Sequence, residues 1–359
     1  MRVNRTIVDN ATVGIIANPA SGQDIRRLIS AASGISIAEK TNIVRRLCLG
    51  LWILGVSSVY MIPDKSGIAG SLLRSRDQGE AALGEHWPEI ELLEMPVEEK
   101  AIDTLRAVEL MVQAGVQLII VLGGDGTHRL VANSCGNIPI VALSTGTNNT
   151  FPHFQEATIV GLAAGLVARG VVPISDATNC NKAMRVEING LRTDTALVDL
   201  CLTDELWVGS RAIWKPERVK EIFVTFAEAD AIGWSSIAGL INPISRESNQ
   251  GLRLTLCPPE KGQVTIYAPI APGLILPVGV ESIQILKPLE ILNIDMPKGV
   301  IALDGEREFA FSQSDEIKIW LDLNGPLTVD VPKVLQIAAK RGDLNYPSPY
   351  IRSSHQEVQ

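Results

Sequence analysis

A run of three glycines within five residues, Gly123-Gly124-Asp125-Gly126-Thr127, directly follows an apolar stretch that ends at Leu122. Glycines permit a positive φ and remove the Cβ atoms that would block an approaching phosphate. The backbone N–H groups of Gly126 and Thr127 then open the next helix, where the positive end of the helix dipole favours an anion. The run therefore predicts a phosphate-binding turn with Asp125 at its exposed tip. The alternative is a Gly/Asp turn whose aspartate only caps a helix.

A second polar segment, Ser144 to Phe151, follows another apolar stretch, Ile138 to Leu143. Its hydroxyl, amide and glycine groups suit phosphate and ribose oxygens and need no lysine. Alone, such a segment would be an ordinary polar loop. Two loops of this kind at neighbouring strand ends predict a shared crevice. We expect five residues here to contact a nucleotide: Thr145, Gly146, Thr147, Asn148 and Asn149.

A third segment, Asp304-Gly305-Glu306, follows the apolar run Val300 to Leu303 and places two acids close together. A hairpin turn explains the Asp-Gly pair without any function. Phosphoryl transfer, however, depends on charge neutralisation and alignment more than on covalent chemistry. Acids here would therefore hold Mg²⁺ or orient an acceptor hydroxyl.

The elements that must position the glycine-rich turns alternate between strands and helices. We predict strands at 13–17, 59–62 and 117–122, and helices from about Asp24, through Ile43 to Leu54, and through Ala101 to Ala114. This alternation implies a mostly parallel sheet that is covered on both faces. Ligands of such sheets bind outside the carboxyl ends of the strands.

After the helical stretch Ile159 to Ala168 the chain changes to short runs bounded by Gly, Pro, Asn and Asp, which indicates antiparallel β structure. A final helix, Pro332 to Ala339, is expected to pack back on the first domain. We therefore predict an α/β plus all-β protein. Its Rossmann-like nucleotide-binding domain would span 1–150, its β-sandwich acceptor-side domain 151–330, and its C-terminal helix and tail 331–359.

The composition limits the classes of protein. With 359 residues, of which 46% are hydrophobic and 20% charged, the chain exceeds the usual size of one core, so two domains are expected. The formal net charge of −8 argues against nucleic acid or an anionic membrane as a standing partner. Five scattered cysteines indicate neither a disulfide framework nor a zinc site, and they favour a cytoplasmic protein. The uncharged stretch Leu47 to Ile62 is shorter than the roughly 20 residues of a spanning helix, and we interpret it as a buried helix and a strand.

The Gly-Gly-Asp-Gly-Thr run resembles the signature of the superfamily that contains NAD kinases, diacylglycerol kinases and sphingosine kinases. The upstream segment Asn18-Pro19-Ala20-Ser21-Gly22 resembles the nucleotide-side loop of the same group, which assigns Asn18, Ser21 and Gly22 to nucleotide binding. The similarity runs from about Val13 to Leu323. In detail it is nearest to the ATP-NAD kinase-like branch that includes the acetoin catabolism protein X family.

This resemblance implies a Rossmann-like domain joined to a β-sandwich, with ATP and Mg²⁺ at the cleft and the acceptor hydroxyl near Asp125. By analogy, Asp125 is the general base or organises the metal. The segment Asp304-Gly305-Glu306 resembles the Asp-Gly-Glu element of the lipid-kinase branch, which would bring Glu306 to the cleft as a second catalytic acid and Asp304 to the acceptor. The metal ligands themselves remain unassigned.

Two departures from the superfamily patterns concern the acceptor. NAD kinases carry an Ala-Leu-Asn-Glu or Ala-Leu-Asn-Asp stretch that contacts the dinucleotide, whereas this chain has Val198 in place of the asparagine and keeps the carboxylate as Asp199. The second loop is nearer the lipid-kinase form, with Thr150 in place of its usual aspartate. We therefore assign Asp199 to the acceptor and expect weak phosphorylation of NAD.

The resulting hypothesis is ATP-dependent phosphoryl transfer to a hydroxyl of a small soluble acceptor, with NAD as the first candidate. Two alternatives stay open, a diacylglycerol-kinase-like lipid kinase and a non-catalytic nucleotide-binding regulator associated with acetoin catabolism. We expect a homodimer or homotetramer without nucleic acid or membrane partners. The identity of the acceptor and the preference among phosphoryl donors are left open by the sequence.

Overall fold

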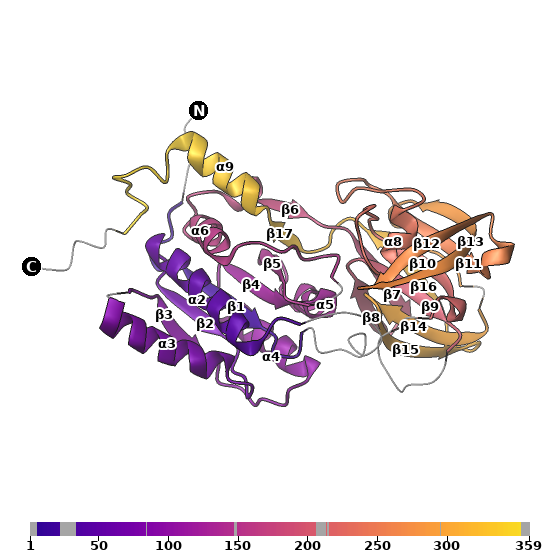
Figure 1. Cartoon of the computed structure of the whole chain (residues 1–359), viewed down its shortest axis with the longest axis horizontal. Helices are drawn as coiled ribbons and strands as arrows, with labels where there is room; N and C mark the ends of the chain where they lie inside the picture. Colours follow the sequence, from indigo (N-terminus) through magenta and orange to yellow (C-terminus); the bar gives the residue numbers. More distant parts are fainter. Residues whose placement is uncertain are drawn as a thin grey trace, which may run out of the picture.

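The computed structural model describes residues 6–21, 34–83, 85–146, 149–205, 213, 215–294 and 296–352. Two layered parts lie side by side (Figure 1), the first drawn mainly in indigo and magenta and the second mainly in orange. The helix that the sequence predicts from about Asp24 lies outside the described residues.

The first part is built on a seven-stranded sheet of order β3-β2-β1-β4-β5-β17-β6. Its strands are β1 (Thr12–Ala17), β2 (Ser58–Met61), β3 (Glu89–Leu92), β4 (Leu118–Gly123), β5 (Ile140–Ser144), β6 (Thr178–Cys180) and β17 (Leu327–Val329). All neighbours pair in parallel except β17 and β6. Every residue of β4 is buried, as its continuous apolar sequence predicts for a strand covered on both faces.

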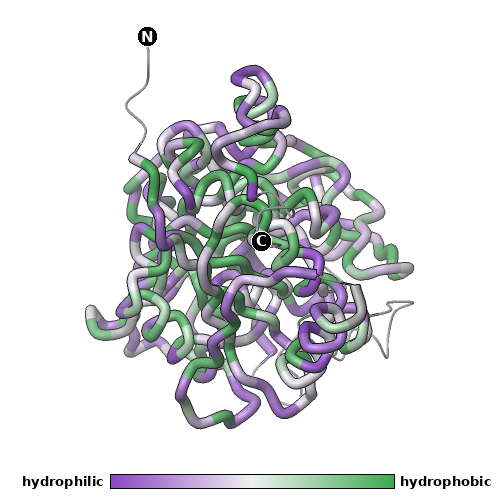
Figure 2. Tube along the Cα trace, turned by 90° about the vertical axis from the view of Figure 1, so that its left-hand side faces the viewer, coloured by the Kyte–Doolittle hydropathy of each residue, from purple (hydrophilic) through white to green (hydrophobic). Residues whose placement is uncertain are grey.

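Helices cover both faces of this sheet. They are α2 (Ile37–Ile53), α3 (Ile68–Leu83), α4 (Ala101–Gln113), α5 (Asp125–Ser134), α6 (Ala157–Ala168), α7 (Ile174–Ala177) and α9 (Val331–Arg341). Alternate strand residues point to opposite faces. Val13 and Ile15 of β1 therefore join the core formed with α2, α3, α6 and α9, while Ile16 joins the core formed with α4 and α5. In Figure 2 the hydrophobic stretches gather in the interior and many hydrophilic ones lie in outer turns.

The second part holds an antiparallel seven-stranded sheet, β12-β13-β11-β10-β9-β14-β15, and a three-stranded sheet, β16-β7-β8. The strands are β7 (Ala183–Ile188), β8 (Arg192–Ala196), β9 (Asp199–Thr203), β10 (Val219–Val224), β11 (Gly251–Cys257), β12 (Val264–Ala271), β13 (Leu274–Leu286), β14 (Lys298–Leu303), β15 (Glu306–Ser312) and β16 (Ile317–Asp322). One core joins residues of both sheets, as in a sandwich, and α8 (Ser235–Gly239) contributes to a second core. The described residues of this part also include two short 3₁₀ turns, η1 (Pro216–Arg218) and η2 (Pro259–Lys261). The predicted fold class, α/β plus antiparallel β, is confirmed.

The chain leaves the first part later than residue 150. Helix α6 packs against α2 and α9, and its apolar residues belong to the core of the first sheet. The sequence predicts a second domain over 151–330, but α6 carries no charged side chain and is buried among helices, so it lies with the first sheet, as does β6. The last strand, β17, returns to the same sheet between β5 and β6.

The uncharged stretch from Leu47 to Ile62 forms the second half of α2 and then β2, as interpreted from the sequence. Within the described residues, no helix is long and apolar enough to cross a membrane.

Glycines let α2 and α6 approach closely. A Cβ atom added to Gly161 of α6 would lie 2.6 Å from the carbonyl oxygen of Leu47, and one added to Gly50 of α2 would lie 3.0 Å from the backbone of Gly161. Backbone cannot yield as a side chain does, so any larger residue must separate the helices.

We predict that Gly161→Ala destabilises the protein by roughly 1–3 kcal/mol, because the added methyl group overpacks this contact. The matched control is Gly70→Ala in α3, where the added Cβ would lie 3.5 Å from the flexible end of Arg74. This control should be neutral or stabilising by up to about 1 kcal/mol, because alanine favours helix. Thermal and denaturant unfolding of both variants gives the change in stability caused by each substitution. If both alanines destabilised the protein, or both stabilised it, the close contact between α2 and α6 would not explain the effect.

Candidate active site

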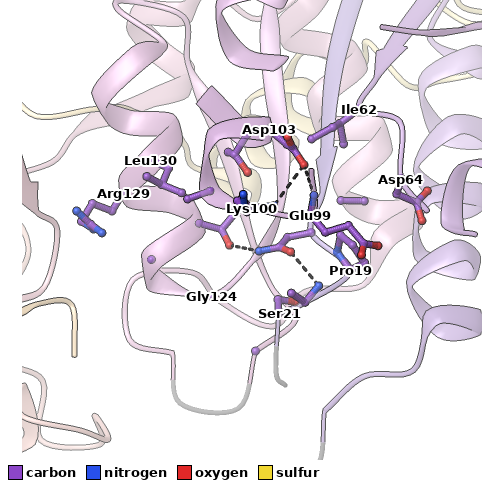
Figure 3. Close-up of a pocket in the computed structure, with 18 of the residues that line it drawn as sticks. Pro19, Ser21, Ile62, Asp64, Glu99, Lys100, Asp103, Gly124, Arg129 and Leu130 are labelled. Atoms are coloured by element: carbon purple, nitrogen blue, oxygen red, sulfur yellow. Dashed lines mark hydrogen bonds between the residues drawn. The ribbon is translucent and has the colours of Figure 1, made fainter. Parts of the chain in front are cut away.

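A cleft of about 640 Å³ opens at the carboxyl ends of β1 and β4 and reaches the second part of the molecule. Loops of the first part form most of its wall (Figure 3). Four acidic residues of the second part also line it: Asp194, Asp304, Glu306 and Glu308. The cleft is therefore bounded by both parts, at the sheet edge where the sequence predicts a ligand.

The glycines of the first turn are required for space. A Cβ atom on Gly123 would lie 2.5 Å from Cβ of Thr127, and one on Gly124 would lie 2.9 Å from Oδ1 of Asn149. Neither these two glycines nor Gly126 uses the positive φ that glycine permits. Side chains packed around the turn, not its backbone conformation, exclude larger residues here.

Helix α5 begins at this turn with an N-cap residue, Gly124, that offers no side-chain hydrogen bond to the helix. His128 Nδ1 lies 2.8 Å from the Gly124 carbonyl oxygen, and burial lowers the pKa of His128 to about 4. The imidazole is therefore neutral at neutral pH. The positive end of the α5 dipole faces the cleft without an N-cap side chain over it, which favours an anion there.

Hydrogen bonds tie three loops together around this helix end. Asn18 Nδ2 donates to Thr127 Oγ1 at 2.8 Å, and the hydroxyl groups of Ser21 and Thr145 lie 2.8 Å apart. The Thr145 amide donates to the Gly123 carbonyl oxygen at 3.1 Å. The loop after β1, the glycine turn and the loop after β5 thus form one connected wall.

The predicted nucleotide-binding residues divide into three groups. Those that line the cleft are Asn18, Ser21, Gly124, Gly126, Thr127, Gly146 and Asn149. Gly123 and Thr145 are buried behind this wall. Gly22, Thr147 and Asn148 lie outside the described residues. Asn149 donates from Nδ2 to Ser144 Oγ at 2.7 Å, which fixes its side chain across the glycine turn.

Asp125 is half-buried in the cleft wall, so the exposed tip expected from the sequence is wrong. Its carboxylate accepts hydrogen bonds from the backbone amides of Thr150, at 3.1 Å to each oxygen, and Phe151, at 2.9 Å. The carboxylate therefore has a fixed position, and it orders the second loop.

The same two loop residues are held from the other side by an arginine of the second part. Arg246 donates to the carbonyl oxygens of Thr150 at 2.6 Å and Phe151 at 3.0 Å, and it pairs with Glu228 at 3.0 Å. Thr150 Oγ1 also donates to the Ile232 carbonyl oxygen at 3.0 Å. This segment consequently connects the glycine turn to the second part.

Glu306 reaches the glycine turn from β15. Its Oε1 atom lies 3.5 Å from the position that a Cβ on Gly126 would occupy. Asp125 and Glu306 come from distant parts of the chain and line the same cleft. Their catalytic roles remain predictions.

Asp304 touches the cleft, but its carboxylate turns inward. It accepts hydrogen bonds from the backbone amides of Leu197 at 3.1 Å, Val198 at 2.8 Å and Asp199 at 3.3 Å. Burial raises the pKa of Asp304 to about 6, against the opposing effects of Arg129 and these amides. The backbone of Asp304 has a φ of 48°, a conformation that aspartate and asparagine tolerate better than most residues. These contacts anchor backbone and do not present the carboxylate to an acceptor.

Asp199 and Val198 do not reach the cleft wall among the residues that the structure describes. Asp199 is 6% exposed, and Val198 is 1% exposed within an apolar core. The structure therefore joins the backbone of Asp199 to Asp304 but does not bring Asp199 to the cleft wall. A sequence motif could not reveal this, because the side chain's direction depends on the pairing of β9.

Arg129 is a cleft residue that the sequence analysis missed. It is 4% exposed and extends from α5 to Asp194 of β8, at 2.9 Å, and to Glu308 of β15. Burial opposes its charge, but Asp194, Glu308 and Asp304 outweigh burial and raise the pKa of Arg129. A signal was present, since Arg129 follows Asp125 by four residues and thus shares its helix face.

Lys40 of α2 was also missed, and no motif marks it. It is fully buried, and its Nζ atom contacts carbonyl oxygens of the loop after β1. Helical spacing places it among buried residues, where a lysine is unusual unless its ammonium group is satisfied.

No group of three or more His, Cys, Asp or Glu residues is arranged to hold a metal ion in the described ranges. The carboxylates that line the cleft still fit Mg²⁺, because proteins often bind this ion through only one or two carboxylates together with substrate phosphates. Asp125 and Glu306 are the carboxylates suited to that role. Asp194 and Glu308 pair with Arg129, and Asp304 binds backbone amides.

Family comparisons agree with the two parts of the structure. The ATP-NAD kinase N-terminal domain matches residues 13–171, and the Acetoin catabolism protein X C-terminal domain matches residues 182–324. Over 335 residues the chain is 44% identical to Acetoin catabolism protein X from Cupriavidus necator, covering 91% of this chain and 92% of that protein. The chain belongs to the acetoin catabolism protein X family.

The resemblance to the NAD kinase and diacylglycerol kinase superfamily, in its acetoin catabolism protein X branch, is thereby confirmed. A solved structure of a diacylglycerol kinase-like protein from Bacillus anthracis strain Sterne aligns with a TM-score of 0.41 at 14% identity. That alignment covers 90% of this chain and 98% of the other.

The carboxyl group of Asp304 should give the protein a distinctive pH dependence. Its folded pKa is about 6, whereas an unfolded aspartate has a pKa of about 4. Between these values the folded chain binds more protons, so this group's cost to stability is relieved as the pH falls through 6.

We predict that, when the pH falls from 7 to 5, the free energy of unfolding of the unaltered protein rises by about 1 kcal/mol relative to that of Asp304→Asn. Asparagine keeps an acceptor oxygen and tolerates the positive φ, so the variant should fold. Denaturant unfolding of both proteins at each pH gives the difference, in which the other titrating groups largely cancel. Parallel stability curves would show that Asp304 remains ionised throughout this range.

Proposed function

We propose that this family member transfers the γ-phosphoryl group of ATP to a hydroxyl group of a small soluble acceptor. The observation that carries the proposal is one cleft that contains an uncapped helix N-terminus and two carboxylates, Asp125 and Glu306, from different parts of the molecule. The resemblance of the chain to the kinase superfamily supports the same chemistry. Fold alone would not, because one fold serves many functions.

Phosphate groups would bind at the start of α5. Gly124 and Gly126 have no Cβ atoms there, so a phosphate can approach the backbone N–H groups. The polar side chains of Asn18, Ser21 and Thr127 line the same wall. Lys65 and Lys100 are exposed at the cleft and supply positive charge near the entering polyphosphate.

In the transfer step the acceptor oxygen attacks the γ-phosphorus, and the bond from that phosphorus to the β–γ bridging oxygen breaks to release ADP. The hydroxyl proton must pass to a base. We assign this proton to Glu306, whose carboxylate forms no hydrogen bond or ion pair with a described residue. Asp125, held by two backbone amides, would orient the acceptor hydroxyl. Mg²⁺ bound with ATP would neutralise charge on the phosphates.

Two alternatives have specific support. The inward anchoring by Asp125 and Asp304 suits a non-catalytic nucleotide-binding regulator, because both carboxylates then have structural roles. The form of the second loop and the Asp-Gly-Glu segment favour a lipid kinase. A measurement of turnover distinguishes the regulator, which would have none, from a kinase. The acceptor that is phosphorylated distinguishes a lipid kinase from a kinase that acts on a small soluble acceptor.

The deciding experiment is a screen of hydroxyl acceptors with ATP and Mg²⁺, with ADP release as the signal. NAD is the first acceptor to include, followed by small polyols and by diacylglycerol in mixed micelles. We predict weak or no conversion of NAD to NADP, because Val198 replaces the usual asparagine and its side chain is buried in a core. Robust formation of NADP would overturn that expectation. Binding of ATP without turnover on any acceptor would favour the regulator.

We predict that Asp125→Asn reduces turnover by a factor on the order of 10² to 10⁴ while ATP affinity changes far less. The variant should fold, because one amide oxygen can still accept from both backbone amides. The matched control is Asp330→Asn at the N-terminus of α9, where Asp330 accepts from Lys333 N at 3.0 Å away from the cleft. Turnover, ATP affinity and melting temperature are measured on both. Unchanged turnover in Asp125→Asn would remove this carboxylate from the mechanism.

A further inference from the structure

The ammonium group of Lys40 is enclosed by the loop that follows β1. The residue has no exposed surface, and Nζ donates to the carbonyl oxygens of Asn18 at 3.0 Å, Pro19 at 2.9 Å and Ser21 at 3.0 Å. All three N–H bonds of the ammonium group are thus used by one short segment of backbone. The segment folds around the lysine.

The opposite side of this segment faces the cleft. Residues Asn18 to Ser21 line it, and their side chains bond to Thr127 and Thr145. The positive charge of Lys40 therefore lies directly behind a wall that faces the N-terminus of α5. Helix α2 supplies the charge, and α5 supplies the aligned dipole.

No acid in the described part of the chain forms an ion pair with Lys40, and the loop from Asn18 to Ser21 carries no charged side chain. Acids near α2 pair with arginines instead, Glu39 and Glu156 with Arg46, Glu85 with Arg45 and Asp77 with Arg76. Glu80 of α3, which packs against α2, is exposed to solvent. Helix α6 has no charged residue. A buried cation without a counter-ion is costly, and an anion beyond the loop would reduce that cost.

We propose that Lys40 is a positioning residue for the phosphate groups of the nucleotide, shaping the loop by its three hydrogen bonds and supplying the buried charge that the bound phosphates balance. This inference rests on the proposed function, since it assumes that a nucleoside diphosphate or triphosphate occupies the cleft. It adds a role for a residue that does not itself line the cleft.

A change in protonation follows from this arrangement. Burial lowers the pKa of Lys40 to about 8, so in the free protein about half of the molecules carry the charge at pH 8. An anion nearby favours the charged form and raises the pKa again. Nucleotide binding should therefore take up close to half a proton at pH 8 and more at pH 9, but little at pH 7. The phosphate groups of the nucleotide, with a pKa of about 6, would exchange protons mostly near pH 7 and hardly at pH 9, so their contribution to the proton count would decrease as the pH rises.

The first measurement uses the unaltered protein and ADP. Titration calorimetry at pH 7, 8 and 9 is run in two buffers with different ionisation enthalpies, and the difference in binding enthalpy gives the number of protons taken up. We expect uptake that rises from pH 7 to pH 9. Equal enthalpies in both buffers at pH 8 and 9 would overturn the role of Lys40 without affecting the proposed function.

The second measurement compares two buried lysines. Lys40→Met should weaken ADP binding about tenfold or more and abolish the proton uptake, because a methionine can neither satisfy the three carbonyl oxygens nor carry charge. Lys182→Met is the matched control, since Lys182 is 5% exposed and donates to the carbonyl oxygens of Ser245 at 3.1 Å and Gln250 at 2.7 Å. Burial lowers the pKa of Lys182 to about 8 as well, yet the residue does not line the cleft and its Nζ atom makes no hydrogen bond to the loop from Asn18 to Ser21.

The control should lose stability but keep ADP affinity and proton uptake. A folded Lys40→Met protein that binds ADP as tightly as the unaltered protein would contradict the inference. If Lys40→Met does not fold, proton uptake by the unaltered protein and by Lys182→Met still decides it. Absence of ADP and ATP binding by the unaltered protein at millimolar concentrations would contradict the proposed function, and the role of Lys40 would fall with it.

Discussion

Backbone polar groups in the loops around the cleft must find partners outside regular secondary structure, and charged side chains supply them. Lys40 and Arg246 bind carbonyl oxygens, while Asp125 and Asp304 bind amides. Buried backbone groups without partners would cost free energy comparable to lost hydrogen bonds. The shape of the site therefore depends on charges that have two roles, to complete the backbone and to set the electrostatic potential that a ligand meets.

Helix α5 links these roles across the molecule. Asp125 in its first turn fixes the segment that Arg246 holds from the other part, and Arg129 one turn later pairs with Asp194 and Glu308. The contacts of Arg129 end directly in the second part, and the contact of Asp125 reaches that part through Arg246. A shift of that part relative to the first sheet would disturb the helix terminus where phosphate is proposed to bind. The two parts are thus coupled through the element nearest to the chemistry.

The sequence predicted those features that local pattern determines. Continuous apolar runs identified the parallel strands, and the spacing of the glycines identified the turn after β4. It could not predict that Asp304 turns inward to backbone amides or that Asp199 stays away from the cleft, because these directions depend on strand pairing over more than a hundred residues. Lys40 was missed for a related reason. A lysine in a helix is expected in solvent, and only its neighbours in space reveal its three carbonyl partners.

The position of β17 has a consequence for the order in which the protein is made. The strand consists of residues 327–329, near the end of the described chain. In the sheet it lies between β5 and β6, although the first strand of that sheet begins at residue 12. A nascent chain emerging from the ribosome must therefore expose the edge of β5 until almost all of the described chain has been synthesised. Unpaired strand edges invite association with other chains.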